Sequence, residues 1–359
     1  MGPFVRADLG FSETQLGVAI SVFWLFMAVG GVAGGRVGQR LGATLTIRLG
    51  VAGSIAAIGG TALAPNWATV LFFMACAGAA SALSQPAVDL ALFEAVPRDR
   101  LSLAFGIKQT SLPAAALVAG LAIPVLATSV GWRLAFAACA VVGLPALLGM
   151  PRLLSGHRSG KGVHVASGAK MTGILAFAAV FTLAMIAVTA TGAFYVESAI
   201  SGGSTANAAG VFLAIGGAFG VVGRFVFSWR LGSLARPLIA TSVIMLIGGL
   251  GVTCLSVASP TWPLLIVTIV AIGAGWGWNG LLTLAVVRTY PLAPARASGY
   301  IVLGVGAGGV LGPVLFGFTV QHFGFSVAWI GAGLCFFAAA AMLARLAKRP
   351  TAVTEESSE

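Results

Sequence analysis

Long apolar runs, separated by short polar connections, make up almost the whole chain. A helix that spans a bilayer needs about 20 apolar residues, and eleven segments of this sequence are long and apolar enough. They cover residues 13–37, 44–64, 68–95, 102–128, 132–152, 171–197, 204–229, 237–257, 261–288, 296–321 and 325–346. Their apolar residues are continuous rather than alternating, which is the pattern of spanning helices and not of spanning strands. We therefore predict an all-α, multi-pass membrane protein.

The composition agrees with this pattern and excludes several classes of protein. Of the 359 residues, 58% are hydrophobic and 8% are charged, and the mean hydropathy is +1.02. A soluble domain carries about 25% charged residues, so a soluble enzyme, a secreted module and a disordered scaffold are all excluded. The three histidines lie in or beside loops, and the four cysteines lie inside apolar runs. These positions indicate no metal, no cofactor and no enzyme activity.

The basic residues predict the orientation of the chain in the membrane. The net charge is +11, but the Lys and Arg residues form short clusters between the apolar runs. We interpret them as topology signals rather than as a surface for nucleic acid, because basic loops stay on the cytoplasmic side. Nearly all of these clusters lie in alternate connections. We therefore expect a plasma (inner) membrane protein whose C-terminus is cytoplasmic and whose N-terminus, as this chain has it, faces outside.

The second part of the chain repeats the first. Gly35-Arg36 matches Gly223-Arg224, and Gly131-Trp132 matches Gly324-Phe325, at offsets of about 190 residues. Internal repeats of this kind build transporters around one central site. The repeat divides the chain into a first half, a cytoplasmic linker, a second half and a cytoplasmic tail, over residues 1–152, 153–170, 171–350 and 351–359.

One apolar run has no partner in this repeat. The run 171–197 opens the second half, and its counterpart would precede residue 1. Residues 1–12 have the character of an outer loop that leads into the first visible run. We therefore expect two pseudo-symmetric six-helix halves, with 11 of 12 helices present in this chain. A wrongly assigned start of the gene and a genuine truncation both remain open as explanations.

A short basic motif follows the first run. Gly35-Arg-Val-Gly-Gln39-Arg40-Leu-Gly42 resembles the signature loop Gly-x-x-x-Asp-Arg-x-Gly-Arg of the major facilitator superfamily, and further matches follow in order along the chain. The resemblance implies a secondary transporter of a small-molecule substrate that works by alternating access, and we expect a monomer in the lipid bilayer. Gln39 stands where the signature has Asp. Arg40 is kept, and by analogy is expected to meet Glu94.

Two charged residues inside apolar runs are the sharpest candidates for a substrate or coupling site. Asp89 is eight residues before Pro97, and Lys108 is eight residues after Arg100. Both therefore lie roughly 12 Å from the same turn, on adjacent antiparallel helices, where they can pair directly. The functional interpretation is a proton carrier at Asp89 and an anion site at Lys108. The alternative is a structural ion pair.

Aromatic and amide residues form a second group of substrate candidates. Trp276, Trp278 and Asn279 lie in the middle of one run, and the resemblance places that helix at the central cavity. Such a cluster can hold a substrate by stacking and one hydrogen bond, although tryptophans also fill space between glycines. Trp24 and Gln109 are further candidates of the same kind.

Two charged residues near helix ends complete the candidates. Glu197 is interpreted either as a proton carrier at an outer gate or as a solvated acid. Arg224 is expected to reach the lipid headgroups or to brace the inner gate. We assign to the gate Gly35, Gln39, Arg40, Gly42, Glu94 and Arg224.

These features predict proton- or gradient-coupled transport of a small solute. Lys108 favours a small organic anion. Efflux of drugs or other amphipathic compounds by the same fold is the alternative, and so is a non-functional truncated transporter.

Overall fold

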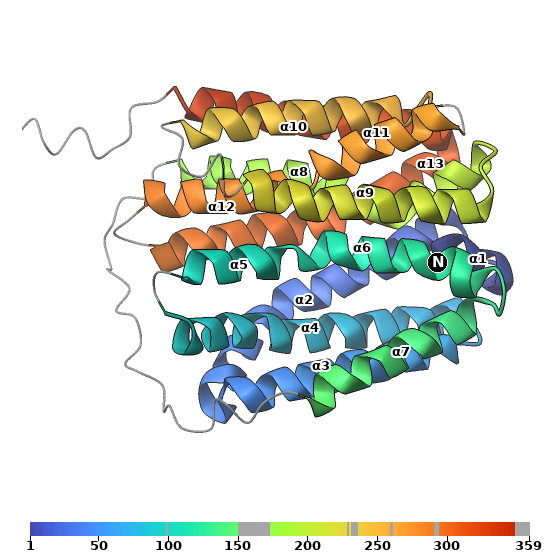
Figure 1. Cartoon of the computed structure of the whole chain (residues 1–359), viewed down its shortest axis with the longest axis horizontal. Coiled ribbons are helices and arrows are strands. Elements are labelled where there is room, and N and C mark those ends of the chain that lie inside the picture. The colour runs from blue at the N-terminus through green and yellow to red at the C-terminus, as the bar shows by residue number, and fades with distance from the viewer. Residues whose placement is uncertain are drawn as a thin grey trace, which may run out of the picture.

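The chain folds into a bundle of long helices that run along a common direction (Figure 1). The computed structural model describes residues 1–97, 100–149, 173–227, 230, 236–258, 261–290 and 294–348. In chain order the elements are α1 (Gly2–Leu9), α2 (Glu13–Leu41), α3 (Ala43–Ala62), α4 (Trp67–Ala95), α5 (Leu101–Gln109), α6 (Ser111–Ala122), the π-helical turn η1 (Ile123–Ala127), α7 (Trp132–Leu148), α8 (Ile174–Ser201), α9 (Ala206–Val226), α10 (Pro237–Cys254), α11 (Trp262–Gly273), α12 (Trp278–Thr289) and α13 (Pro294–Leu346). The predicted linker and acidic tail lie outside the described residues.

The predicted spanning runs are confirmed as helices. Within the described residues, nine helical segments are long and apolar enough to cross a membrane, and α7 is a further apolar helix of 17 residues. The run 102–128 is divided into α5, α6 and η1, and the run 261–288 is divided into α11 and α12. α13 covers the last two runs, with a sharp kink at Gly324. The protein is therefore an all-α, multi-pass membrane protein.

Local chemistry determines where several helices begin. Ser12 and Gln15 form a reciprocal capping box at the start of α2, in which each side chain bonds the other residue's backbone. Asn66 caps α4 by accepting from the backbone N–H of Thr69 at 3.0 Å. The expectation of a loop over residues 1–12 is wrong, because residues Gly2–Leu9 form α1, which Gly10 ends in a left-handed conformation. The outer location of this segment stays a prediction.

Two glycines that the predicted repeat makes equivalent turn the backbone in the same way. Gly131 precedes α7 with φ 88° and ψ 161°, and Gly324 turns α13 with φ 81° and ψ 170°. The two residues that the repeat makes equivalent thus share a conformation that glycine adopts without strain. Gly324 divides α13 into a first limb, residues 294–323, and a second limb, residues 325–346. The first limb packs along α8, and the second packs against α10.

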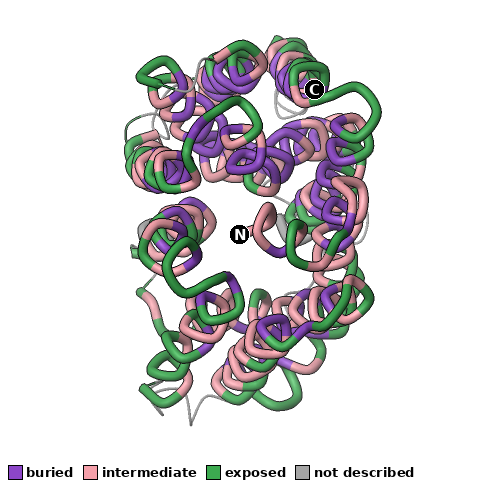
Figure 2. Tube along the Cα trace, turned by 90° about the vertical axis from the view of Figure 1, so that its right-hand side faces the viewer, coloured by how far each residue is buried: buried purple, intermediate pink, exposed green. Residues whose placement is uncertain are grey.

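The second half is more deeply buried than the first. Of the residues in the spanning windows, 22–28% are buried for the spans between residues 13 and 127, and 44–67% for those between residues 174 and 346. Figure 2 shows the same difference, with most buried residues in the upper part of the view. The most buried of the described spans is α8. The expectation of 11 out of 12 helices stays a prediction.

Two seams join the halves, one between α2 and the first limb of α13, the other between α6 and α9. In each seam a glycine lies against a proline carbonyl of the other half. A Cβ added to Gly17 would lie 2.2 Å from the Pro313 oxygen, and one added to Gly217 would lie 2.8 Å from the Pro113 oxygen. Glycine permits this close approach of two helices.

Candidate substrate site and gates

The predicted contact between Asp89 and Lys108 is present. The Lys108 Nζ donates to Asp89 Oδ1, which joins α4 to α5. The side chains are 38% exposed for Asp89 and 20% exposed for Lys108, so the pair borders open space rather than the packed core. The contact is confirmed, whereas the roles of the two residues in binding or coupling stay predictions.

Arg224 lies between the two halves. It is in the last turn of α9 and is only 5% exposed, so the expectation that it reaches the headgroups is wrong. Its Nε donates to the Trp276 carbonyl at 2.7 Å, and its Nη1 donates to the Gln109 carbonyl. The first contact is within the second half, and the second contact crosses to α5. Arg224 therefore links the two halves, whereas its role in gating stays a prediction.

Both carbonyls are available because the helices are interrupted beside them. The N–H of residue 113 would normally bond the Gln109 carbonyl, but Pro113 has no N–H. Trp276 precedes Gly277, the N-cap of α12, so its carbonyl lies outside the hydrogen-bond ladder of that helix. Arg224 thus supplies donors to two acceptors that their own helices leave open.

The tryptophan cluster is packed differently from the prediction. Trp276 is 3% exposed and Trp278 is fully buried, with its ring 5.4 Å from that of Phe181. Neither indole face is open to a ligand in this conformation, so the predicted stacking platform is not formed. Neither indole N–H has a hydrogen-bond acceptor among the described residues. Asn279 is half-buried and accepts from the Thr283 hydroxyl at 3.5 Å.

An ion-pair cluster joins the halves at the end of the bundle that carries α1 (right-hand side of Figure 1). Arg6 of α1 contacts Glu197 of α8 at 2.6 Å and Glu13 of α2 at 3.0 Å. The Glu197 side chain is 7% exposed, so its interpretation as a solvated acid is wrong. Sequence reasoning missed Arg6, because nothing in the pattern connects it with a residue 191 positions away.

A second cluster ties α1 to the first half. Asp8 Oδ2 accepts from Arg133 and, at 3.2 Å, from the indole N–H of Trp132. The Arg133 guanidinium also lies 4.3 Å from the centre of the Trp132 ring. The hydrogen bond from Arg133 lowers the pKa of Asp8 below its ordinary value. α1 is therefore held by Asp8 on one side and by Arg6 on the other.

Trp24 is part of the seam between α2 and α13. A Cβ added to Gly309 would lie 2.5 Å from the Trp24 ring, which shows how closely the indole covers this glycine. One turn earlier, the Ser21 hydroxyl donates to the Val310 carbonyl at 2.6 Å. The half-buried Trp24 thus contacts the opposite half, whereas its predicted contact with substrate stays untested.

The predicted gating loop lies at the other end of the bundle. Gly42 turns the chain between α2 and α3 with φ 82°, and Gly35 lies on α2 one turn before Gln39. Gln39, Arg40 and Glu94 are exposed. No ion pair joins Arg40 and Glu94 in the described structure, so the contact expected by analogy is absent. The role of these residues in gating stays a prediction.

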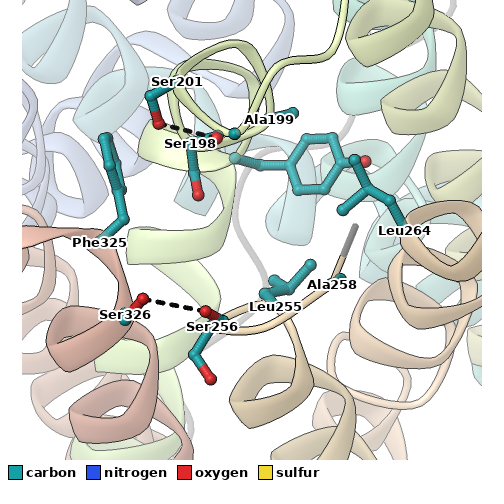
Figure 3. A pocket seen from close by; sticks show the side chains of 11 residues that line it. Ser198, Ala199, Ser201, Leu255, Ser256, Ala258, Leu264, Phe325 and Ser326 are labelled. Carbon is teal, nitrogen blue, oxygen red and sulfur yellow. Dashed lines mark hydrogen bonds between the residues drawn. The ribbon is translucent and has the colours of Figure 1, made fainter. Parts of the chain in front are cut away.

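A cavity of about 240 Å³ lies in the second half, at the α1 end (Figure 3). Its lining includes four serines, Ser198, Ser201, Ser256 and Ser326. The Ser326 hydroxyl donates to the Ser256 carbonyl at 2.9 Å, and Ser198 accepts from the Trp329 indole at 2.8 Å. No sequence pattern predicts this cavity, because its residues come from separate helices. It lies within one half and is distinct from the interface between the halves.

Two curated proteins are similar to part of the chain. A hexuronate transporter of Bacillus subtilis (strain 168) is 23% identical over 142 residues, which are 40% of this chain and 34% of that protein. A tetracenomycin C resistance and export protein of Streptomyces glaucescens is 28% identical over 146 residues, 41% of this chain and 27% of that protein. The matches thus span about a third or less of these relatives.

The fold matches a solved transporter over nearly its whole length. That structure is of a bacterial homologue of the human lysosomal transporter Spinster, in an inward-facing and occupied conformation. The TM-score is 0.70 at 17% identity, over 96% of this chain and 90% of the other. The family model described as Major Facilitator Superfamily matches residues 1–299. The chain therefore belongs to the major facilitator superfamily of membrane transporters.

Proposed function

We propose that this chain transports a small organic anion by alternating access, coupled to a proton gradient through Asp89. The observation that supports it best is the Asp89–Lys108 ion pair, which places two opposite charges on adjacent helices inside apolar segments. Ionisable side chains are costly in such segments and mark the pathways of substrates and protons. The partial exposure of the pair gives both groups access to a ligand.

The pair couples two events. An anion that binds Lys108 takes the place of the Asp89 carboxylate, and a carboxylate without its cation binds a proton more readily. Anion binding and proton uptake then support each other, and both ligands move together when the halves rearrange. The driving force for that rearrangement is the difference in affinity between the two states.

The expected setting is the plasma membrane, with the C-terminus in the cytoplasm and the protein acting as a monomer. The basic connections support this orientation. This orientation is tested with single cysteines that replace the exposed residues Ser129 and Arg40. Each cysteine is labelled with an impermeant thiol reagent in intact cells and again in permeabilised cells. Ser129 is expected to react from outside, and Arg40 only after the membrane is permeabilised.

Hexuronates are the first substrates to test, because one relative is a hexuronate transporter. A hexuronate carries one carboxylate on a sugar, so D-glucuronate and neutral D-glucose form a pair of probes that differ in charge. Preference for the acid over the sugar would show that the protein recognises the anion.

The decisive experiment measures uptake of labelled D-glucuronate and other small carboxylates into proteoliposomes, with and without a pH gradient. Asp89→Asn is expected to abolish the stimulation by the gradient. Asp89→Glu is the matched control, since it keeps a carboxylate beside Lys108. If Asp89→Asn keeps the stimulation of the parent protein, the proton carrier lies elsewhere.

Export of an amphipathic compound is the second candidate function. It is supported by the similarity to the tetracenomycin C export protein. Inverted vesicles that accumulate tetracenomycin C in response to a pH gradient, but take up no carboxylate, would favour export over anion uptake.

A further inference from the structure

Arg224 is a buried cation that no described carboxylate neutralises. A guanidinium has five N–H donors, and here its contacts are two neutral carbonyl oxygens. The described carboxylates are engaged elsewhere or exposed: Asp8 with Arg133, Glu13 and Glu197 with Arg6, Asp89 with Lys108, and Glu94 at the surface. Burial of a charge is costly unless an opposite charge compensates it. The surroundings of Arg224 thus lack the anion that its burial calls for.

A second donor without an acceptor belongs to the residue that Arg224 contacts. The Trp276 indole N–H is buried and has no hydrogen-bond partner among the described residues. Buried donors in native proteins are nearly always satisfied, and an exception calls for an explanation such as a missing ligand. An anion offers only acceptors, which is what the guanidinium requires, while the Trp276 ring itself lies against Gly192 of α8.

The neighbouring residues give an anion a way to this position. Lys108 directly precedes Gln109 and is partly exposed, and a Cβ added to Gly106 would meet nothing within 4 Å. This part of α5, which leads up to Gln109, therefore borders open space at Gly106 and Lys108. The charge of Lys108 is already neutralised by Asp89, whereas that of Arg224 is not.

We propose that Arg224 binds the carboxylate of the anionic substrate, and that the carboxylate displaces the Gln109 carbonyl from the guanidinium. This rests on the proposed transport of an organic anion, in which Lys108 is the first cation that the anion meets and Arg224 is the residue that then holds its carboxylate. A carboxylate forms stronger, charge-assisted and bidentate hydrogen bonds with Arg than a neutral carbonyl does. Its arrival removes the contact between α9 and α5, so binding favours separation of the halves on that side.

Thiol labelling tests this exchange without knowledge of the natural substrate. A cysteine at Thr110, next to Gln109, is introduced into a chain whose native cysteines, Cys76, Cys139, Cys254 and Cys335, are replaced. The purified protein in nanodiscs is treated with a maleimide in the presence of D-glucuronate, L-lactate or benzoate. D-glucose and an equal concentration of chloride are the controls. At least one carboxylate is expected to raise the labelling rate, saturably and by about threefold or more.

Four variants distinguish a binding role from a structural one. Arg224→Gln is expected to label rapidly without any anion and to show no response. Arg224→Lys keeps the charge but not the bidentate geometry, so about tenfold more carboxylate should be needed. Pro113→Ala gives the Gln109 carbonyl a helix donor, which weakens its hold on Arg224 and should lower the concentration of carboxylate required. Arg36→Gln, at the exposed repeat counterpart on α2, should behave as the parent.

The proposal fails if no carboxylate in the panel changes the labelling of the parent, or if Arg224→Gln responds at the concentration that the parent needs. Where Arg224→Gln does not fold, the other two variants test the proposal. Arg224→Lys should raise the carboxylate concentration required for faster labelling, and Pro113→Ala should lower it. Uptake assays on the same variants separate this proposal from the transport function. Carboxylate uptake by Arg224→Gln with an unchanged KM leaves the function standing and refutes the site. If a carboxylate changes the labelling of the parent but not of Arg224→Gln, and no carboxylate is taken up, the binding site stands and the transport function is refuted.

Discussion

Removal of Arg6 is expected to open the α1 end of the bundle. Arg6 contacts the buried Glu197 of the second half and also Glu13 of the first half. The only other described side-chain hydrogen bond between the halves at this end joins Thr128 to Asn207, both of which are exposed. In alternating access these contacts must break, so Arg6→Ala stabilises the state in which they are already absent.

The burial of the two side chains gives the size of this effect. Loss of one partner from a fully buried ion pair costs about 3–5 kcal/mol, because the remaining charge has no compensation. The Glu197 side chain is 7% exposed, but that of Arg6 is 29% exposed, so solvent weakens the pair. About 2 kcal/mol is then a fair estimate, which changes the ratio of the two states by about 30-fold. Glu197→Gln should change this ratio less, because Arg6 still has its ion pair with Glu13.

Spin labels at Ser129 and Ser201, exposed residues of opposite halves at this end, measure the opening as a change in their distance distribution. Arg133→Ala is the matched control, because it removes an arginine at the same end. That arginine pairs with Asp8 within the first half, and both side chains are more than 40% exposed. The distribution should move to longer distances for Arg6→Ala and stay unchanged for Arg133→Ala. Equal distributions for Arg6→Ala and the parent would refute the role of this cluster as a latch.

Two further predictions concern packing. Gly17→Ala places a Cβ 2.2 Å from the Pro313 carbonyl oxygen and should lower the rate of uptake by at least about tenfold. Gly31→Ala on the same helix is the control: its Cβ meets nothing within 4 Å, so the same assay should show no change. Thr268→Val leaves the buried Tyr195 hydroxyl without its 2.6 Å partner and should reduce the free energy of unfolding in detergent by about 1–3 kcal/mol. A second change, Tyr195→Phe, removes the unpaired hydroxyl and should largely reverse this loss. A double variant as unstable as Thr268→Val alone would contradict this.

Contacts between neighbouring helices could be predicted from the sequence, because a shared turn fixes their register. Asp89 and Lys108 are equally far from the turn that joins α4 to α5, so equal rises along two helices bring them together. The contact of Arg6 with Glu197 has no such constraint. It depends on how α1 lies against α8, which is determined by packing between the halves.

The orientation of side chains about a helix axis was harder to predict. The sequence identified Trp276 and Trp278 as unusual residues, but which way they point depends on the interruption between α11 and α12. That interruption directs Trp278 toward Phe181 and the core. For Arg224 a signal was present, since Pro113 follows Gln109 by four residues and leaves its carbonyl free. A proline reveals a free acceptor, although the sequence does not say which donor will reach it.

The free acceptors explain why a charged residue occupies position 224. Inside a bilayer every backbone carbonyl needs a donor, and irregular backbone is tolerated only where side chains or water satisfy it. The interruptions beside Gln109 and Trp276 present two such carbonyls, one from each half, within reach of α9. An apolar residue at position 224 would leave both unsatisfied, whereas a guanidinium reaches both at once. The same neutral acceptors leave its charge uncompensated, so the ligand that most readily replaces one of them is an anion.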